Sequence, residues 1–172
     1  MIEKAIEIKN NMNEVKFDEY EKYLTFSISK QIYCIKIESV SDMIAIREIK
    51  EVLFLPSFVK GVINLKGKII PVIDLIRMQF NLNQKDQGDW FYLVIITVRN
   101  TYVGLKVDSI LKIVSLSESE IDNIPHFSTS VTGIGKIKDS SKIILDAEGI
   151  LPLKELVAIK KNIEQEIRPV IN

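Results

Sequence analysis

The sequence contains a single cysteine, Cys34, and a single histidine, His126, among its 172 residues. One cysteine cannot form an internal disulfide, which is typical of proteins in a reducing compartment. A histidine without cysteine or histidine partners nearby disfavours a zinc site. Cys34 lies between Tyr33 and Ile35 in an apolar run, where a small buried hydrophobe is the expected role. We therefore expect neither a metal site nor a catalytic centre built on a thiol or an imidazole.

An excess of charge of one sign is also lacking. Lys plus Arg and Asp plus Glu each number 23, so the formal net charge is zero, which gives no overall basic field for nucleic acid or anionic lipid. The longest uncharged apolar run, residues 90–98, is far shorter than the roughly 20 residues of a membrane helix. The N-terminus carries acidic residues and does not resemble a signal peptide. The composition therefore predicts a cytoplasmic protein with a packed core and no membrane insertion.

Motifs for nucleotide binding and catalysis are incomplete. One glycine-rich segment approaches a phosphate-binding loop. However, five residues instead of four separate Gly61 from the pair Gly67-Lys68, and Ile69 stands where Ser or Thr would bind magnesium. Acidic residues such as Asp74 each follow an apolar run. A residue at such a position commonly ends a strand or caps a helix, which explains these acids without a catalytic role. We expect no enzyme activity and no cofactor.

Short apolar runs dominate the chain, and glycines, prolines or polar residues separate them. Such runs predict β-strands, and two runs with a short gap predict a hairpin. The expected strands are residues 23–28, 31–37, 49–55, 59–65, 67–73, 90–98, 101–107, 110–116, 131–137 and 141–146. Because Pro71 cannot donate a backbone hydrogen bond, its strand is expected at a sheet edge or at a bulge. Without long helices between them, these strands indicate an all-β fold of barrels.

Helices are expected to be few and short. They cover residues 38–46, residues 74–80 with Asp74 as N-cap, and a closing helix after Pro152 in which Leu153, Leu156 and Val157 form the apolar face.

Polar segments set the expected boundaries. Residues 81–89 are predicted to be a linker and residues 117–130 a loop. We expect residues 1–19 to be an N-terminal extension, residues 20–158 to form one domain of two subdomains, and residues 159–172 to be a tail.

One block of the chain carries a specific motif. Residues 56–75, PSFVKGVINLKGKIIPVIDL, closely resemble the central motif of the CheW-like family. In that family a Pro-x-Phe-Val-Lys-Gly segment precedes Asn-Leu-Arg-Gly and then Ile-Val-Pro-Val-Ile-Asp-Leu. The main departure is Lys66, where the family usually has arginine. The resemblance extends outward to residues 23–44, 103–116 and 131–151.

The resemblance implies both a fold and a function. The expected fold is two small five-stranded β-barrels packed on a shared core, with short helices and a C-terminal helix. The expected function is that of a non-catalytic adaptor that couples methyl-accepting chemoreceptors to the histidine kinase CheA at membrane receptor arrays. Strand edges and apolar grooves can bind helices or similar barrels without a cofactor.

The resemblance also implies the receptor-binding residues. Val40, Gly61 and Ile113 are expected to form the groove that receives the cytoplasmic tip of a chemoreceptor. Asp42 and Lys66, where the family usually has glutamate and arginine, are expected to face each other beside this groove.

A second set of residues is implied for the kinase. Ile37 and Ile49, on one face of the first barrel, are expected to dock the regulatory domain of CheA. Phe127, in a polar loop, is expected to make a further contact. The residues alone favour a core position for Ile37 and Ile49, and they leave Phe127 either tucked in or offered to a partner.

Two alternatives remain open. One is a free-standing relative of the CheV type without its receiver domain. The other is a small-barrel nucleic-acid-binding module, which predicts a basic stripe interleaved with exposed aromatic side chains. The strands carry few paired Lys or Arg residues and the aromatics mostly lie in apolar runs, which favours the adaptor.

Overall fold

The computed structural model describes residues 19–80, 88–125 and 128–167. The strands in chain order are β1 (Glu21–Ile28), β2 (Gln31–Lys36), β3 (Val40–Ile46), β4 (Val59–Leu65), β5 (Lys68–Ile73), β6 (Phe91–Val98), β7 (Thr101–Val107), β8 (Ser109–Leu116), β9 (Ile121–Asn123), β10 (Val131–Ile137) and β11 (Ser140–Leu145). The helices are α2 (Leu75–Phe80), α3 (Ala147–Ile150) and α4 (Leu153–Ile167), with 3-10 turns η1 (Ile37–Ser39) and η2 (Glu118–Glu120). The predicted all-β class is confirmed.

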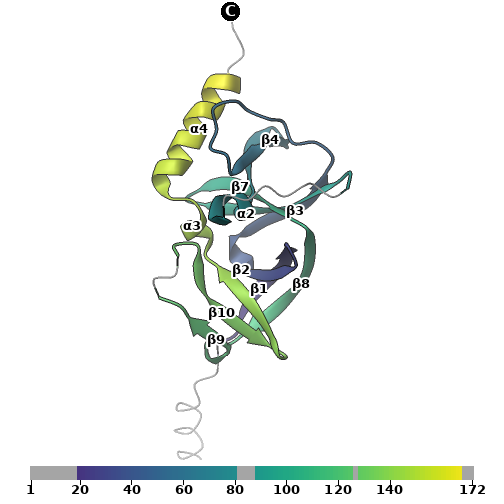
Figure 1. Ribbon diagram of the computed structural model, residues 1–172, viewed down its shortest axis with the longest axis vertical. Helices are drawn as coiled ribbons and strands as arrows, with labels where there is room; N and C mark the ends of the chain where they lie inside the picture. Colours follow the sequence, from purple (N-terminus) through teal and green to yellow (C-terminus); the bar gives the residue numbers. More distant parts are fainter. Residues whose placement is uncertain (1–18, 81–87, 126–127, 168–172) are drawn as a thin grey trace, which may run out of the picture.

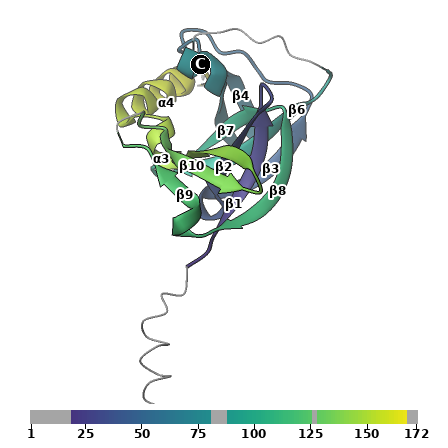
Figure 2. The same ribbon diagram turned by 60° about the horizontal axis from the view of Figure 1, so that its bottom comes forward.

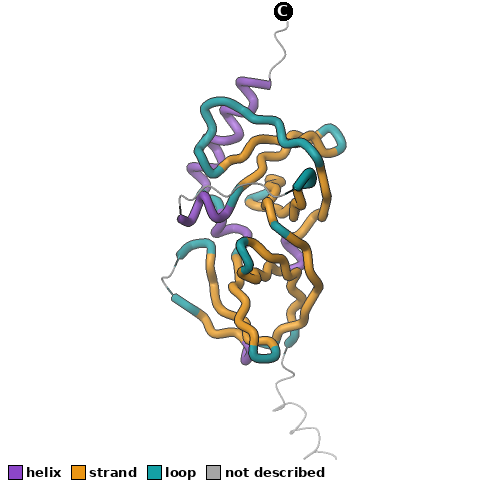
Figure 3. The backbone as a smooth tube through the Cα atoms, turned by 45° about the vertical axis from the view of Figure 1, so that its right-hand side comes forward, coloured by secondary structure: helices purple, strands orange, loops and turns teal. Residues whose placement is uncertain are grey.

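The strands form two sheets that are stacked along the long axis of the molecule (Figure 1). The lower sheet has the order β8-β1-β2-β11-β10-β9, and the upper sheet has the order β3-β6-β7-β5-β4. Each sheet curls round on itself, as the backbone trace shows (Figure 3). The short strand β9 makes the lower sheet six-stranded, whereas the sequence pattern placed its residues in a loop.

The hairpins follow the sequence prediction closely. Three turns, at Ser29-Lys30, Arg99-Asn100 and Lys138-Asp139, have positive φ at both central residues, and so does the turn at Lys66-Gly67. Two-residue turns of this kind match the right-handed twist of the flanking strands, which splay apart in ordinary turns. Tight turns therefore set the register of four hairpins: β1–β2, β4–β5, β6–β7 and β10–β11.

The two sheets do not correspond to the two consecutive halves of the sequence. Strand β3 follows the β1–β2 hairpin along the chain, yet it pairs with β6 in the upper sheet. Strand β8 follows the β6–β7 hairpin, yet it pairs with β1 in the lower sheet. Each sheet thus receives an edge strand from the other half, and β3 and β8 both lie along one flank of the molecule (Figures 1 and 2).

The largest hydrophobic cluster lies between the sheets and unites them. Phe26 and Ile35 reach it from the lower sheet, Ile96 and Leu105 from the upper sheet, and all four are fully buried. This cluster is the shared core that was expected for two packed barrels. Smaller clusters fill the two barrels themselves, one around Leu93 and the other containing residues such as Cys34.

Two short segments differ from the prediction. Residues 38–46 were expected to be helical, but they form η1 and β3. The helical spacing of Val40, Met43 and Ile44 was misleading, because β3 is an edge strand whose burial alternates residue by residue. Residues 49–55 were expected to be a strand, but they contribute only an isolated bridge between Lys50 and Val62. Of the predicted linker, residues 81–87 lie outside the described part of the chain.

The strand that contains Pro71 is not at an edge, but its pairing with β4 contains a register shift between Val59 and Gly61, which agrees with the predicted bulge. β5 is an interior strand between β7 and β4, rather than an edge. Pro71 lies opposite Val62, whose backbone N–H and C=O both bond to Lys50 instead. Pairing between β5 and β7 begins one residue later, at Val72. The donor that proline lacks is therefore not needed by either neighbouring strand.

The helical ends are set by recognisable interactions. Asp74 caps α2 as predicted, because its Oδ1 accepts hydrogen bonds from the N–H groups of Ile76 and Arg77, each at 3.1 Å. α4 differs from the prediction in its extent and its buried face. It continues to Ile167 instead of ending near residue 158.

The buried face of α4 consists of Leu156, Ile159 and Ile163, which pack on the shared core. Leu153 and Val157, which were expected on the apolar face, are each 55% exposed. The segment that was expected to be a tail from residue 159 onward thus contributes two core residues.

This packing predicts a difference between two apolar residues of α4. Ile159→Ala should lower the free energy of unfolding by about 2–5 kcal/mol, because it opens a cavity in the shared core. Val157→Ala should change it by less than about 0.5 kcal/mol, because Val157 faces solvent. Urea denaturation of both variants measures the difference, and similar values would contradict the placement of α4.

Candidate functional site

The two exchanged strands border the shared core along one flank of the molecule. Val40 and Ile110 are partly buried and pack against this core. Met43 is 44% exposed and lies opposite the core residue Val94, and Ile113 is 53% exposed. We call this strip of Val40, Met43, Ile110 and Ile113 the β3–β8 seam. It combines a partly buried base with exposed apolar side chains, which is the composition of a surface that binds an apolar partner.

Gly61 does not lie at this seam. It is a buried residue of β4, which is the opposite edge of the upper sheet from β3. Its φ is +154°, and an added Cβ would stand 2.2 Å from the carbonyl oxygen of Lys50. Gly61 therefore permits the close approach of the Lys50 backbone to β4. The structure brings Val40 and Ile113 to one flank, and it gives Gly61 a role in closing the upper barrel.

Asp42 and Lys66 line one small pocket of about 180 Å³, together with Lys68 and Tyr102. The Oδ1 of Asp42 accepts a hydrogen bond of 2.8 Å from the N–H of Met43. The Nζ of Lys68 lies 4.5 Å from the centre of the Tyr102 ring. Among the described residues no ion pair joins Asp42 to Lys66, although both line this pocket.

The residues expected to bind the kinase are placed in different surroundings. Ile37 is partly buried against the shared core, whereas Ile49 is partly buried against the interior of the upper barrel. Phe127 lies outside the described residues. Ile37 and Ile49 therefore pack at the margins of two different hydrophobic clusters.

A groove that the sequence did not indicate lies between the two edge strands of the upper sheet. Its volume is about 550 Å³. We call it the β3–β4 groove, and its apolar lining consists of Ile44, Ile46, Val62, Ile63, Leu65 and Ile69. Glu48 and Lys50 also line it. Sequence reasoning missed it because it treated these residues as strand core, and only the pairing order shows that β3 and β4 are both edges.

The end of the lower barrel holds a more polar pocket of about 540 Å³. There the Nζ of Lys36 lies 2.7 Å from Glu21, and the hydroxyl of Tyr23 donates to the same carboxylate at 3.3 Å. The hydrogen bond from Lys36 lowers the pKa of Glu21 and raises that of Lys36. These charges satisfy one another. The part of the chain that the structure describes contains no group of three acidic, cysteine or histidine residues able to hold a metal ion.

Comparison with known proteins identifies the family. Residues 22–155 match the CheW-like domain, which is most of the chain and spans both sheets. The chain belongs to the CheW-like family. Members of this family are non-catalytic scaffold proteins of chemotaxis signalling.

Individual relatives agree with this assignment. The chain is 30% identical over 136 residues to chemotaxis protein CheW of Bacillus subtilis, covering 76% of this chain and 86% of the relative. It is 26% identical over 148 residues to that of Treponema pallidum, covering 81% and 86%. The crystal structure of scaffolding protein TtCheW from Thermoanaerobacter tengcongensis is similar, with 27% identity and a TM-score of 0.71, covering 80% of this chain and 96% of that chain.

Two aromatic side chains of this CheW-like chain, Trp90 and Phe91, disfavour the nucleic-acid alternative. Arg47 lies over Trp90 at 4.6 Å, and Phe91 has Lys60 and Lys106 over its ring at 5.4 Å and 5.7 Å. Binding of single strands needs open aromatic faces on which bases stack. Here cations from the protein itself cover these rings.

The single thiol is buried. Cys34 has no exposed surface, and burial raises the pKa of its thiol to about 11. The reactive thiolate is therefore scarce at neutral pH, so Cys34 serves as the small core residue that the sequence predicted. None of the helices among the described residues is long and apolar enough to cross a membrane.

The close approach at Gly61 predicts a contrast between two glycines of one hairpin. Gly61→Ala should lower the free energy of unfolding by at least about 2 kcal/mol, because the new Cβ collides with the Lys50 carbonyl. Gly67→Ala should cost only about 1–2 kcal/mol of backbone strain, because nothing lies within 4 Å of its added Cβ. Chemical denaturation compares the two, and equal losses would remove the structural role assigned to Gly61.

Proposed function

We propose that this chain couples chemoreceptors to the histidine kinase CheA, acting in the cytoplasm at membrane receptor arrays. The observation that carries the proposal is the family match over residues 22–155, which includes both sheets and the central motif. The proposed functional unit begins near residue 20 and includes all of α4, whose Ile159 and Ile163 belong to the shared core. Residues 1–19 form an extension of this unit.

The β3–β8 seam is the proposed receptor site. The cytoplasmic tip of a chemoreceptor would present an apolar helical face, and an apolar strip with a partly buried base is suited to bind such a face. Val40 forms the base of the seam, while Ile113 offers side-chain surface. Asp42 and Lys66 would supply polar contacts from the pocket that they share in the upper barrel, and Gly61 would act through the shape of that barrel.

The proposed kinase contacts are separate from the seam. Ile37 and Ile49 would support the surface that meets the regulatory domain of CheA, and Phe127 would make a further contact. Partial burial of Ile37 and Ile49 supports a role in shaping this surface. The coupling function is tested by co-sedimentation of the purified chain with a CheA regulatory domain and a receptor cytoplasmic fragment. If the chain sediments with neither partner, the proposal is refuted.

The seam predicts a specific effect of Ile113→Glu. This variant should weaken binding of the receptor fragment at least ~tenfold, about 1.4 kcal/mol, because it places a charge where an apolar contact forms. Binding of the CheA domain should not change. Leu153→Glu is the matched control, because Leu153 is exposed to a similar extent, 55% against 53%, but lies on α4. Equal effects of the two variants would show that the seam is not the receptor site.

The shared pocket predicts that Asp42 and Lys66 couple only in the complex. Asp42→Lys and Lys66→Asp should each weaken receptor binding, and the double swap should recover part of the loss, because the partner removes water from both charges. In the free protein their double-mutant cycle on the free energy of unfolding should show coupling below ~0.5 kcal/mol, since no ion pair joins them among the described residues. Strictly additive effects on receptor binding would rule out the pairing.

A further inference from the structure

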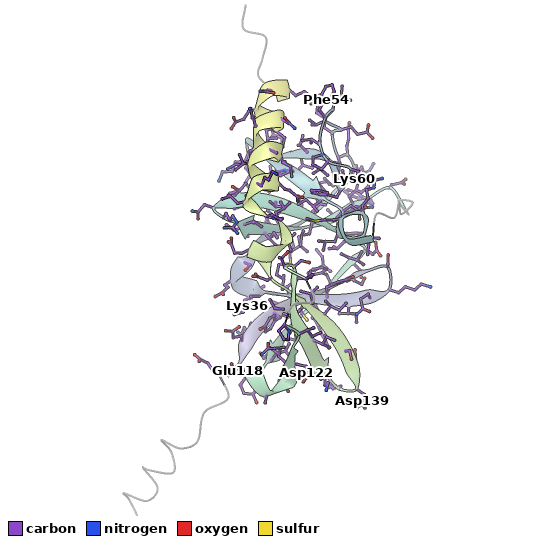
Figure 4. All side chains as sticks on the ribbon, turned by 60° about the vertical axis from the view of Figure 1, so that its left-hand side comes forward. Lys36, Phe54, Lys60, Glu118, Asp122 and Asp139 are labelled. Atoms are coloured by element: carbon purple, nitrogen blue, oxygen red, sulfur yellow. The ribbon has the colours of Figure 1, made fainter. Side chains whose placement is uncertain are left out.

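The loop between β3 and β4 contains a two-residue turn, Leu53-Phe54, whose side chains face solvent. Leu53 is 67% exposed and Phe54 is 89% exposed. Val52 and Leu55, on either side of this turn, pack instead against the shared core. Phe54 lies at the end of the molecule beside the C-terminal part of α4 (Figure 4). The loop is therefore attached to the core on both sides of a turn that buries little surface of its own.

The backbone of this turn is strained at Phe54. Its φ is +61°, a left-handed conformation that is unfavourable for a bulky side chain. Every other non-glycine residue of positive φ in the described chain lies in a two-residue hairpin turn, where the paired strands hold it. Phe54 has no such support, because residues 51–58 contain no strand. Another interaction must therefore keep Phe54 in this conformation.

The C-terminal part of α4 supplies that interaction. Asn162 Nδ2 donates a hydrogen bond of 3.1 Å to the carbonyl of Phe54, and the N–H of Leu53 donates one of 3.3 Å to Oε1 of Glu166. Asn162 and Glu166 are four positions apart and so lie on the same face of the helix. Ile163, next to Asn162, belongs to the shared core. We call these two hydrogen bonds the α4 brace, and they tie the turn to a helix that is anchored in the core.

The same loop carries Ile49, a residue of the proposed kinase surface. Ile49 packs against the interior of the upper barrel, and its Cγ2 would lie 2.9 Å from a Cβ added at Gly61. The next residue, Lys50, pairs with Val62 through backbone hydrogen bonds of 2.9 Å and 2.8 Å. Only three positions separate Lys50 from Leu53, and such a segment spans at most ~11 Å. A movement of the turn therefore acts directly on the bridge and on Ile49.

We propose that Asn162 and Glu166 are positioning residues, through which α4 holds Ile49 and its neighbours in the conformation that binds the kinase domain. This inference rests on the kinase contact proposed above for Ile49 and adds that the C-terminal helix controls it. Without the α4 brace, Phe54 relaxes toward an ordinary negative φ and draws Lys50 away from β4. Receptor binding does not depend on the brace, because β6 and β1 set the register of β3 and β8 at the seam.

The experiment measures binding of full-chain variants to the CheA regulatory domain and to the receptor fragment by titration calorimetry. The strain at one residue and two exposed hydrogen bonds are comparable in free energy, so removing both bonds shifts the turn. The double variant Asn162→Ala/Glu166→Ala should therefore bind the kinase domain at least ~fivefold more weakly. Its receptor binding should stay within ~twofold of wild type. Glu164→Ala, which removes another exposed acid of α4, is the matched control and should change neither affinity.

A further substitution, Phe54→Asn, separates positioning from direct contact. Asparagine adopts the left-handed conformation at lower cost than phenylalanine, so the turn no longer needs the α4 brace. Phe54→Asn alone should leave kinase binding within ~twofold of wild type, and in the double variant it should restore most of the lost affinity. General damage to α4 would not be rescued in this way. If Phe54→Asn alone weakens binding as much as the double variant does, Phe54 itself touches the kinase and the positioning role is wrong.

Amide hydrogen exchange of the free chain gives a readout that needs no partner. The N–H groups of Lys50 and Val62 bond across the bridge, so the double variant should exchange both at least ~fivefold faster, and Phe54→Asn should slow them again. Amides of β1 and β2 should not change. If exchange responds but the wild-type chain does not bind the kinase domain, the brace stands and the proposed function fails. If the wild-type chain binds and the double variant changes neither kinase affinity nor exchange at the bridge, the inference is overturned.

Discussion

The structure depends on two central hairpins whose strands are buried on both faces. In β1 and β6 four consecutive residues are buried, 23–26 and 93–96 respectively. One face of each strand lines its own barrel and the other face packs on the shared core, because successive side chains of a strand point in opposite directions. Separating the two sheets would expose one face of both hairpins to water. The two barrels are therefore not independent domains.

The two sheets have the same strand arrangement, and each has an edge strand that comes from the other half of the chain. Without β9, the lower order β8-β1-β2-β11-β10 corresponds strand by strand to the upper order β3-β6-β7-β5-β4, including the parallel pair in each. β6 begins 70 residues after β1, at Phe91 instead of Glu21. Asp74 and Asp146 both follow the last strand of a hairpin and precede a helix. The exchange of β3 and β8 creates the seam, so Val40 and Ile113, 73 positions apart, border the same core.

The sequence predicted those features that depend on neighbouring residues. Hairpins were predictable because a polar pair between two apolar runs is a local signal, and the cap at Asp74 is equally local. The order of strands was not predictable, because it depends on contacts between distant segments. Edge strand β3 was mistaken for a helix, since alternating exposure left an apolar spacing that also fits a helical turn. Phe54 was hidden in an apolar run that reads as a strand, and only the structure shows its left-handed backbone and its exposure.

The surfaces left for binding arise where the two barrels differ. In the lower barrel, β9 pairs with β10 at three positions, opposite Gly133, Ile134 and Gly135. In the upper barrel the corresponding contact is the single bridge from Lys50 to Val62. An added Cβ would meet a backbone oxygen at Gly133 as at Gly61, so both glycines admit a crossing strand. That crossing extends over three residues in the lower barrel and one residue in the upper barrel, which leaves an apolar groove between the edge strands of the upper barrel. Such departures from symmetry let two similar barrels present different surfaces, since two identical barrels would present the same surface twice.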